Sequence, residues 1–342
     1  MHTHTSTPSH TGRSTGRLMR ALALADGHET GTVAFCESQN WLEKAAIIDV
    51  VKAGVGGSNT SDLPFNDVVA DFLETIRPYS ILSRLDRVRL VPSRTRTIAF
   101  GAGASAAVVA EMKPIPMSKA SMLGLTVEPI KIGALALVSK ELVESQARGV
   151  DEAIADDLAA AVGQADDIAF FSPSSAGSVL HDAPTAVSTG STLADVDADL
   201  QQAMELLTAA GGKLQDAVWV LSPAAAGKLA LMRGAGGALA HPDIGPNGGS
   251  LSKIPAITSE SAHGLIGLLD QRGILVNSDA RTTITMSHNT TLQLSDTPTS
   301  APSAPVELVS VFTTESVAFK AVLHRGWQTR AGAGAYISGG IW

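Results

Sequence analysis

The sequence predicts a mixed helix-and-sheet protein, of the α/β or α+β class, on three observations. Apolar residues recur at helical spacing over 41–51, 65–76 and 150–169. They alternate at period two over much of 87–138 and 265–323, which is typical of half-buried strands. A buried strand at 217–222 runs directly into a helix, and short joins of this kind belong to α/β and α+β folds.

The composition indicates a protein that covers much of its surface with other chains. Charged residues make up 17% of the 342 residues, against about 25% in an average soluble domain. The mean hydropathy is +0.17, yet no stretch reaches the roughly 18 consecutive apolar residues of a spanning helix. A net charge of -8 argues against a protein whose main function is to bind nucleic acid. The single cysteine, Cys36, excludes an internal disulfide framework. The N-terminal segment lacks the apolar region of a secretory signal, so we expect a soluble protein made in the cytosol.

The N-terminal part predicts a flexible arm followed by two modest helices. Residues 1–17 have almost nothing to bury, and Arg13, Arg17 and Arg20 make this end basic. One helix covers 41–51 and ends at a glycine-rich stretch, and a second covers 65–76 and ends before Pro78.

Residues 87–138 predict a long two-stranded ribbon. Alternating apolar residues flank a central stretch, 101–122, that is rich in Gly, Ala, Ser and Pro. An isolated ribbon is marginal in water, so it needs another surface to lie on.

One long helix is expected from Ser139 to about Phe170, roughly 40 Å at 1.5 Å per residue. Its apolar stripe includes Ile154, Leu158 and Val162, and its acidic residues, Asp166 among them, are expected largely off that stripe.

The second half predicts alternating helices and strands. A helix over 193–210 has Thr192 and Asp195 at capping-box spacing, and Ser222 with Pro223 starts a further helix after the strand 217–222. A glycine-rich loop covers 234–249, and a hairpin is expected around 288–289, with strands on to 323.

No motif in the chain predicts catalysis, and we expect no cofactor and no metal. The stretch GAGASA (101–106) matches a dinucleotide fingerprint, but too few residues follow it for the required crossover helix. The nine histidines are scattered without a ligand spacing, and Cys36 has no nearby histidine to activate it. The sequence therefore predicts no catalytic residues.

Charge is distributed in two opposed blocks that are candidates for a subunit interface. The basic block holds Arg77, Arg84, Arg87, Arg89, Arg94 and Arg96, and the acidic block holds Glu141, Glu144, Asp151, Glu152, Asp156 and Asp157. Two interpretations stay open: two independently solvated faces, or a basic arm and ribbon base that lie across the acidic helix of a neighbouring copy.

Several segments, taken in order, resemble the major capsid protein of tailed phages with the Hong Kong 97-type fold. LPFNDVVADFLETIRPYSILSRLDRVRLVP (63–92) is similar to the family's arm helix and the start of its extended loop. The segment 111–145, EMKPIPMSKASMLGLTVEPIKIGALALVSKELVES, resembles the family's returning strand where it enters the long spine helix. Its most characteristic piece is VSKEL (138–142). IAFFSPSSAGSVLHDAPTAVSTG (168–190) and the C-terminal stretch LVSVFTTESVAFKAVLHRGWQTRAGAGAYISGGIW (308–342) resemble the exit from the spine and the closing strands.

The resemblance implies an α+β fold with five parts. These are an N-terminal arm (1–80), an extended two-stranded loop (81–138), a peripheral domain with a long spine helix (139–182), an axial domain (183–305) and C-terminal strands that return to the peripheral domain (306–342).

The resemblance further implies a structural protein, not an enzyme. Such a protein assembles with itself into hexamers, pentamers and an icosahedral head around double-stranded DNA, which it adjoins without sequence-specific binding. Its other partners would be a portal and scaffolding or decoration proteins, with no membrane, and it would be made in the bacterial host cytoplasm and reside in the virion.

Two family features are not expected here. Residues 97–112 contain no lysine for covalent crosslinking, which leaves Lys113 and Lys119 as the lysines nearest the loop tip. The 62 residues before the arm helix are too few for a full scaffolding segment. The alternatives are an encapsulin-like nanocompartment shell and, through Gly101–Ala106, a nucleotide-dependent enzyme.

Overall fold

The computed structural model describes residues 13–25, 28–55, 65–102, 108–109, 121–145, 149–234, 236–262, 264–293 and 308–340. The chain divides into two compact units, each built from separate segments. Unit 1 comprises 1–79, 131–163 and 281–323, and unit 2 comprises 80–130, 164–280 and 324–342. The predicted parts were contiguous in the chain, and their assignment to arm, loop, peripheral domain and axial domain stays a prediction.

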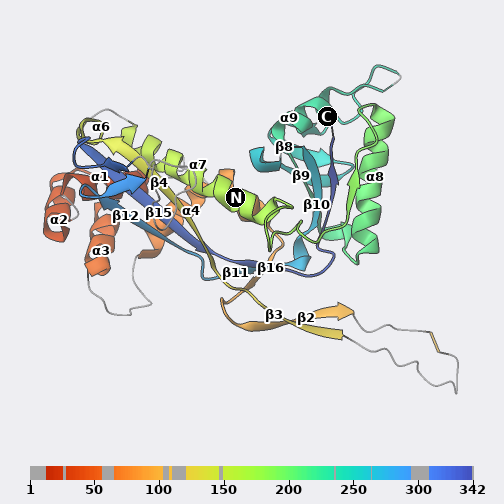
Figure 1. The fold of residues 1–342 in the computed structure, drawn as a ribbon, viewed down its shortest axis with the longest axis horizontal. Coiled ribbons are helices and arrows are strands. Elements are labelled where there is room, and N and C mark those ends of the chain that lie inside the picture. The colour runs from red at the N-terminus through yellow and green to blue at the C-terminus, as the bar shows by residue number, and fades with distance from the viewer. Residues whose placement is uncertain are drawn as a thin grey trace, which may run out of the picture. The chain divides into compact units, whose positions relative to one another are not determined.

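The described part of unit 1 begins with helices that pack against one another, and the helices before residue 56 bury a small core (Figure 1). They are α1 (Arg13–Leu24), α2 (Glu29–Ser38), α3 (Lys44–Val55) and α4 (Phe65–Ile76), with a short 3-10 turn η1 (Arg77–Tyr79) after α4. Leu18, Cys36 and Ile47 are buried together in this core. The predicted helices over 41–51 and 65–76 are confirmed with small shifts. The predicted flexible arm is wrong over 13–17, because α1 begins at Arg13 and buries one face; residues 1–12 lie outside the described part.

The sheet of unit 1 has three strands in the order β12, β15, β4. Their bounds are β12 (Arg281–Ser287), β15 (Ser316–Arg325) and β4 (Ile130–Ser139). The expected hairpin around 288–289 is wrong, because the strand that follows it, β13 (Thr291–Gln293), pairs antiparallel with β14 (Leu308–Ser310) and not with β12.

The single helix expected over 139–170 is two helices. Ser139 caps the short helix α6 (Lys140–Glu144), and the chain then leaves the helical path at Ser145. Gly149, with a φ of +88°, precedes α7 (Val150–Phe171), and a positive φ of this kind is one that glycine adopts without strain. The long helix is therefore 22 residues, about 33 Å long.

Unit 2 contains a seven-stranded sheet in the order β5, β17, β10, β6, β9, β8, β7. The strands are β5 (Thr185–Val187), β17 (Gly334–Ser338), β10 (Leu265–Asp270), β6 (Ala217–Leu221), β9 (Ile254–Thr258), β8 (Gly248–Leu251) and β7 (Ile244–Gly245). The helices α8 (Leu193–Ala209) and α9 (Pro223–Leu231) contribute to its core, with Trp219 fully buried. Short 3-10 turns are η2 (Leu214–Asp216), η3 (Glu260–Ala262) and η4 (Gln271–Gly273).

The predicted start signals of both helices are confirmed. Thr192 and Asp195 form a capping box on α8, and Ser222 caps α9 with Pro223 in its first turn. The glycine-rich stretch 234–249 is partly ordered into β7 and β8, which form an antiparallel hairpin.

A smaller sheet of unit 2 carries the ribbon. Its strands are β1 (Arg89–Val91), β11 (Ile274–Asn277) and β16 (Trp327–Thr329), with β1 parallel to β11. The short helix α5 (Ile81–Arg84) precedes β1, and the ribbon strands β2 (Arg96–Ala102) and β3 (Ser121–Thr126) follow it. The predicted ribbon is confirmed as an antiparallel pair with Arg96 opposite Thr126.

Candidate functional site: the ribbon base and a buried carboxylate cluster

The ribbon strands β2 and β3 pair only with each other among the strands that the structure describes (Figure 1). The base of the ribbon is fixed by a small apolar group of Val91, Leu125, Val127 and Leu275. The turn between β1 and β2 is held by the Arg94 N–H, which donates to the Val127 carbonyl at 2.9 Å. The Asp279 carboxylate accepts a 2.5 Å bond from the Ser93 hydroxyl, and this bond is the largest of the causes that lower the pKa of Asp279. These contacts orient the ribbon where it starts.

Three of the six predicted arginines are engaged within their own unit. Arg87 Nη1 lies 2.7 Å from the Asp216 carboxylate, and Arg77 lies 3.5 Å from Glu74, one helical turn away. Arg84 Nε donates to the Ser80 carbonyl at 3.3 Å. Burial lowers the pKa of Arg84, while the neighbouring Asp167 carboxylate opposes that change.

The other three arginines are exposed at the ribbon base and form no ion pair with any described residue. Arg89 lies on β1, and Arg94 occupies the turn with a φ of 58°. The Arg96 guanidinium lies across Gly124 of the opposite strand, where a side chain would displace it. Arg89, Arg94 and Arg96 therefore present three positive charges over eight residues of chain that no described carboxylate compensates.

The predicted acidic residues also divide into engaged and free groups. Glu152 lies 2.5 Å from Arg13, Asp151 lies 3.4 Å from Arg20, and Glu144 lies 3.8 Å from Lys140. Glu141, Asp156 and Asp157 are exposed and form no ion pair among the described residues. Partial burial raises the pKa of Asp156, and the Glu152 carboxylate adds to that increase. In the described part of the chain no ion pair joins the two predicted sets; the acidic helix instead pairs with α1 of its own chain.

Helix α1 is held against the first turn of α7 by the ion pairs Arg13–Glu152 and Arg20–Asp151. Besides the two ion pairs, Arg20 Nη2 donates to the Ser145 carbonyl at 2.7 Å. Gly16 lies between the two arginines on α1, and a β-carbon there would stand 2.0 Å from the Asp151 carbonyl oxygen. Glycine therefore permits a close approach of the two helices that no other residue would allow.

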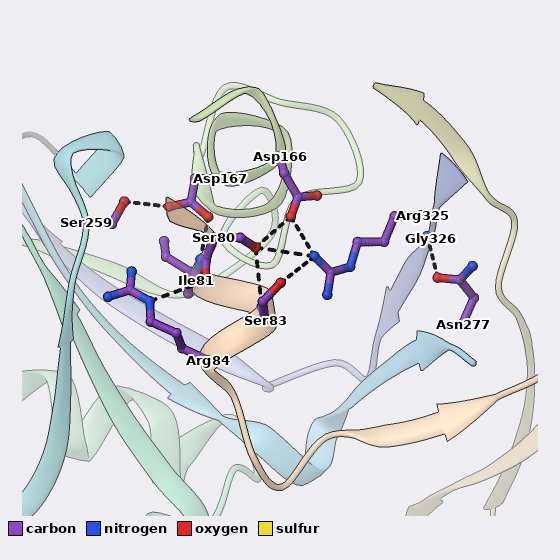
Figure 2. Close-up of polar contacts among 10 residues, drawn as sticks. All are labelled: Ser80, Ile81, Ser83, Arg84, Asp166, Asp167, Ser259, Asn277, Arg325 and Gly326. Carbon is purple, nitrogen blue, oxygen red and sulfur yellow. Dashed lines mark hydrogen bonds and ion pairs between the residues drawn. The ribbon is translucent and has the colours of Figure 1, made fainter. Parts of the chain in front are cut away.

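A cluster of buried polar groups lies at the other end of α7, within unit 2 (Figure 2). Asp166 and Asp167 are both fully buried. Asp166 Oδ2 accepts bonds from the Ser80 hydroxyl at 2.7 Å and from Arg325 Nη1 at 3.0 Å. Asp167 accepts from the Ile81 N–H at Oδ1 and from the Ser259 hydroxyl at Oδ2, both at 2.5 Å. The two adjacent carboxylates thus attach α7 to α5, to the end of β9 and to the end of β15.

Arg325 and Asn277 extend the same cluster. Arg325 Nη1 also donates to the Ser83 hydroxyl at 2.8 Å. The next residue, Gly326, donates its N–H to Asn277 Oδ1 at 2.8 Å and accepts from the Asn277 N–H at 3.0 Å. Asp166 Oδ1 and Arg325 Nε are buried without a hydrogen-bond partner among the described residues.

Burial raises the pKa of both carboxyl groups. Burial is the largest cause for Asp166, and Arg325 and Ser80 oppose it. The pKa of Asp167 is raised to about 7 by burial and by the Asp166 charge, against the hydrogen bonds from Ser259 and Ile81 and the charge of Arg84. The position near the C-terminus of α7 also disfavours negative charge.

This cluster was not predicted, and Asp166 was expected off the buried stripe. The predicted stripe is confirmed at Leu158 and Val162 and is wrong at Ile168, which is 47% exposed. The buried face also includes Ala155, Ala159 and Phe170, and Asp166 falls on it. The spacing 155, 159, 162, 166, 170 is a helical period, so a stripe drawn through the small alanines would have placed Asp166 inside.

The other kinds of site that the sequence could suggest are a metal site, a membrane span, a reactive cysteine and a nucleotide loop. Among the described residues no group of three His, Cys, Asp or Glu side chains could hold a metal ion. Within the same part of the chain, no helix is long and apolar enough to cross a membrane. Cys36 is buried, and burial raises the pKa of its thiol. The nucleotide fingerprint keeps only Gly101 and Ala102 in the described part; its remaining residues, and Lys113 and Lys119, lie outside it.

The fold has counterparts among solved phage structures. The structure from Mycobacterium phage Ogopogo matches with a TM-score of 0.57 and 17% identity, over 76% of this chain and 91% of that one. That from Mycobacterium phage Cain matches with a TM-score of 0.52 and 14% identity, over 77% and 91%. The capsid of the native GTA particle matches with a TM-score of 0.50 and 16% identity, over 77% and 91%. The fold is therefore the α+β fold of Hong Kong 97-type phage capsid proteins, as predicted.

The sequence relatives identify the family. The Phage capsid family model matches residues 65–327, and the chain belongs to that family. A capsid polyprotein of Pseudomonas phage PAJU2 is 30% identical over 361 residues, covering 97% of this chain and 54% of the relative. The chain thus spans about half the length of that curated relative. It is a structural protein of the phage capsid, hence of the virion, and not an enzyme.

Proposed function

We propose that this capsid protein assembles into hexamers and pentamers, which close into an icosahedral head around double-stranded DNA. The observation that carries the proposal is the ribbon. Strands β2 and β3 pair with each other alone among the described strands, and a two-stranded ribbon needs further packing to be stable. A second copy of the chain is the surface that closed symmetric assembly would supply.

The predicted parts keep their proposed roles in this assembly. Residues 1–80 act as the arm, 81–138 as the extended loop, 139–182 as the peripheral domain with its spine helix α7, 183–305 as the axial domain, and 306–342 as the closing strands. The arm is supported by α1–α4, and its helix α1 is clasped to α7 of the same chain.

The contact between neighbouring copies is proposed to join the charged residues that form no ion pair with any other described residue of their own chain. Arg89, Arg94 and Arg96 at the ribbon base would face Glu141, Asp156 and Asp157 of the adjacent copy. The exposure of both sets and their opposite charge support this pairing. Complementary charges of this kind fix register and partner choice more than they add affinity.

The remaining proposed partners follow from the place of the protein in a phage head. A portal, scaffolding or decoration proteins and the packaged DNA would contact the shell, which would assemble in the bacterial host cytoplasm. The net charge of -8 supports proximity to DNA without tight binding.

Electron microscopy of the purified full chain tests the proposal. We expect uniform hollow shells or ring-shaped capsomers; a discrete monomer at high concentration would contradict it. The triple variant Arg89→Glu, Arg94→Glu, Arg96→Glu should lose or misdirect assembly while it stays folded. A matched control reverses three exposed lysines away from the ribbon, Lys213, Lys253 and Lys320, and should assemble normally.

A further inference from the structure

The buried cluster lies where the chain enters and leaves unit 2. The chain passes between the two units after residues 79, 130, 163, 280 and 323. Ser80, Asp166, Asn277 and Arg325 lie within three residues of four of these five points. One connected network therefore holds four of the five connecting segments on the unit 2 side: side chains join Ser80, Asp166 and Arg325, and the Gly326 backbone joins Asn277 to them (Figure 2).

The network contains two adjacent carboxyl groups whose negative charges repel each other when both are ionised. Asp166 and Asp167 are adjacent and fully buried, so two negative charges there repel in a medium of low dielectric constant. The charged groups that face them are Arg84 from α5 and Arg325 from the end of β15. The end of β9 contributes only the neutral Ser259 hydroxyl, and α5 also contributes the Ser80 hydroxyl and the Ile81 N–H.

One proton on Asp167 fits the hydrogen bonds around it. The Ile81 N–H can only donate, so Asp167 Oδ1 accepts in either state. Oδ2 can carry the proton and donate it to Ser259 Oγ, an oxygen that also accepts from the Ser261 N–H at 3.2 Å. The ionised form reverses this one bond, since the Ser259 hydroxyl then donates to Oδ2. Protonation therefore removes the repulsion between the two carboxylates and leaves Asp166 paired with Arg325, while Arg84 keeps its hydrogen bond to the Ser80 carbonyl.

We propose that the Asp166–Asp167 cluster is a pH-sensitive clamp on the segments that connect the two units, tightened when Asp167 is protonated and loosened when it ionises. The clamp is a property of the single chain and does not rest on shell assembly.

The direction of the pH effect follows from the two states of the clamp. Asp167 titrates near 7 when the clamp is closed, and an opened, solvated Asp167 returns to its ordinary value of about 4. The closed form therefore binds the proton more tightly. The opening constant rises by up to tenfold per pH unit between about 4 and about 7, and it is constant above that range.

Hydrogen exchange of the full chain tests the clamp at the Ile81 amide, which donates to Asp167. Protection at Ile81, corrected for the intrinsic exchange rate at each pH, should fall as pH rises from 5 to 7 and then level. In Asp167→Asn, whose amide can donate to Ser259 and accept from Ile81, this pH dependence should disappear. The control Asp182→Asn, an exposed aspartate, should behave as the wild type. Protection at Ile81 that does not change with pH in the wild type would overturn the proposal.

A second variant keeps the test informative if Asp167→Asn does not fold. The Ser259 hydrogen bond lowers the pKa of Asp167, so Ser259→Ala should move the midpoint of the protection curve to higher pH. A purely structural role would reduce protection equally at every pH and leave the midpoint in place, and that result would also overturn the clamp.

Discussion

Two Asp-Asp pairs on helix α7 lie ten residues apart and have opposite surroundings. Asp156–Asp157 is exposed without an ion pair among the described residues, whereas Asp166–Asp167 is fully buried and bonded to three other segments. The exposed pair costs the fold little and is free to meet another chain. In the buried pair the fold needs Asp166, because its removal leaves the charge of Arg325 uncompensated. Identical dipeptides on one helix thus have different surroundings: the buried pair holds segments of the fold together, and the exposed pair belongs to the proposed subunit contact.

The largest expected effect separates these two pairs directly. Asp166→Ala leaves Arg325, whose side chain is 12% exposed, without its carboxylate and should lower the free energy of unfolding by about 3–5 kcal/mol. Asp156→Ala should change it by less than about 0.5 kcal/mol. Urea unfolding followed by tryptophan fluorescence measures both, since Trp219 and Trp327 lie in unit 2 with the cluster and Trp41 lies in unit 1 with Asp156. Equal losses in the two variants would refute the contrast.

The second effect is a loss of stability with rising pH. The pKa of Asp167 is raised to about 7 in the folded chain, so its contribution is full below about pH 4 and is lost as pH rises to about 7. The loss is on the order of 4 kcal/mol from this group. Asp167→Asn should be the more stable protein at pH 8 and should not show this decline. Denaturation curves at pH 5, 6, 7 and 8 measure it, and parallel behaviour of the two proteins would count against a buried proton.

The third effect concerns the start of the same helix. Gly16→Ala should destabilise unit 1 by about 1–3 kcal/mol, because the new methyl group meets the Asp151 carbonyl. In Gly227→Ala of α9 the nearest atom is 3.7 Å away, so that helical glycine should give a gain of up to about 1 kcal/mol. Thermal unfolding of the two variants compares them, and a gain at Gly16 would mean that α1 is not held against α7.

The variant with the smallest expected effect on stability has the largest expected effect on assembly. Asp156→Lys with Asp157→Lys should leave the free energy of unfolding within about 0.5 kcal/mol of the wild type. The same variant should fail to form regular particles, as judged by light scattering and electron microscopy. Normal particles would move the proposed interface away from α7.

Much of the fold follows from sequence, and the exceptions have physical causes. The caps Thr192 and Ser222 and the ribbon were predictable because short-range hydrogen bonds and strand alternation determine them. The hairpin at 288–289 was wrong because β12 pairs with the distant β15, and local sequence does not encode that choice. The break before α7 depends on the positive φ of Gly149, and the spacing of the apolar residues does not reveal it.

The candidate site was predictable only in part. The opposed blocks of charge were visible, but their members differ in what they contact: Arg84 lies at the buried cluster, while Arg94 is exposed. The partners of Asp166 and Asp167 come from residues 80, 81, 259 and 325. Contacts between residues so far apart in the chain are determined by the tertiary fold, so no residue spacing in the sequence predicts them.

A charge-swap experiment tests most directly that the ribbon of one copy binds α7 of the next. The glutamate triple variant of Arg89, Arg94 and Arg96 is mixed with, or combined in one chain with, Asp156→Arg and Asp157→Arg, and particles are counted by electron microscopy. We expect that each reversed set alone abolishes regular shells and that the combination restores them. Shells of normal size and number from the triple variant alone would contradict this expectation.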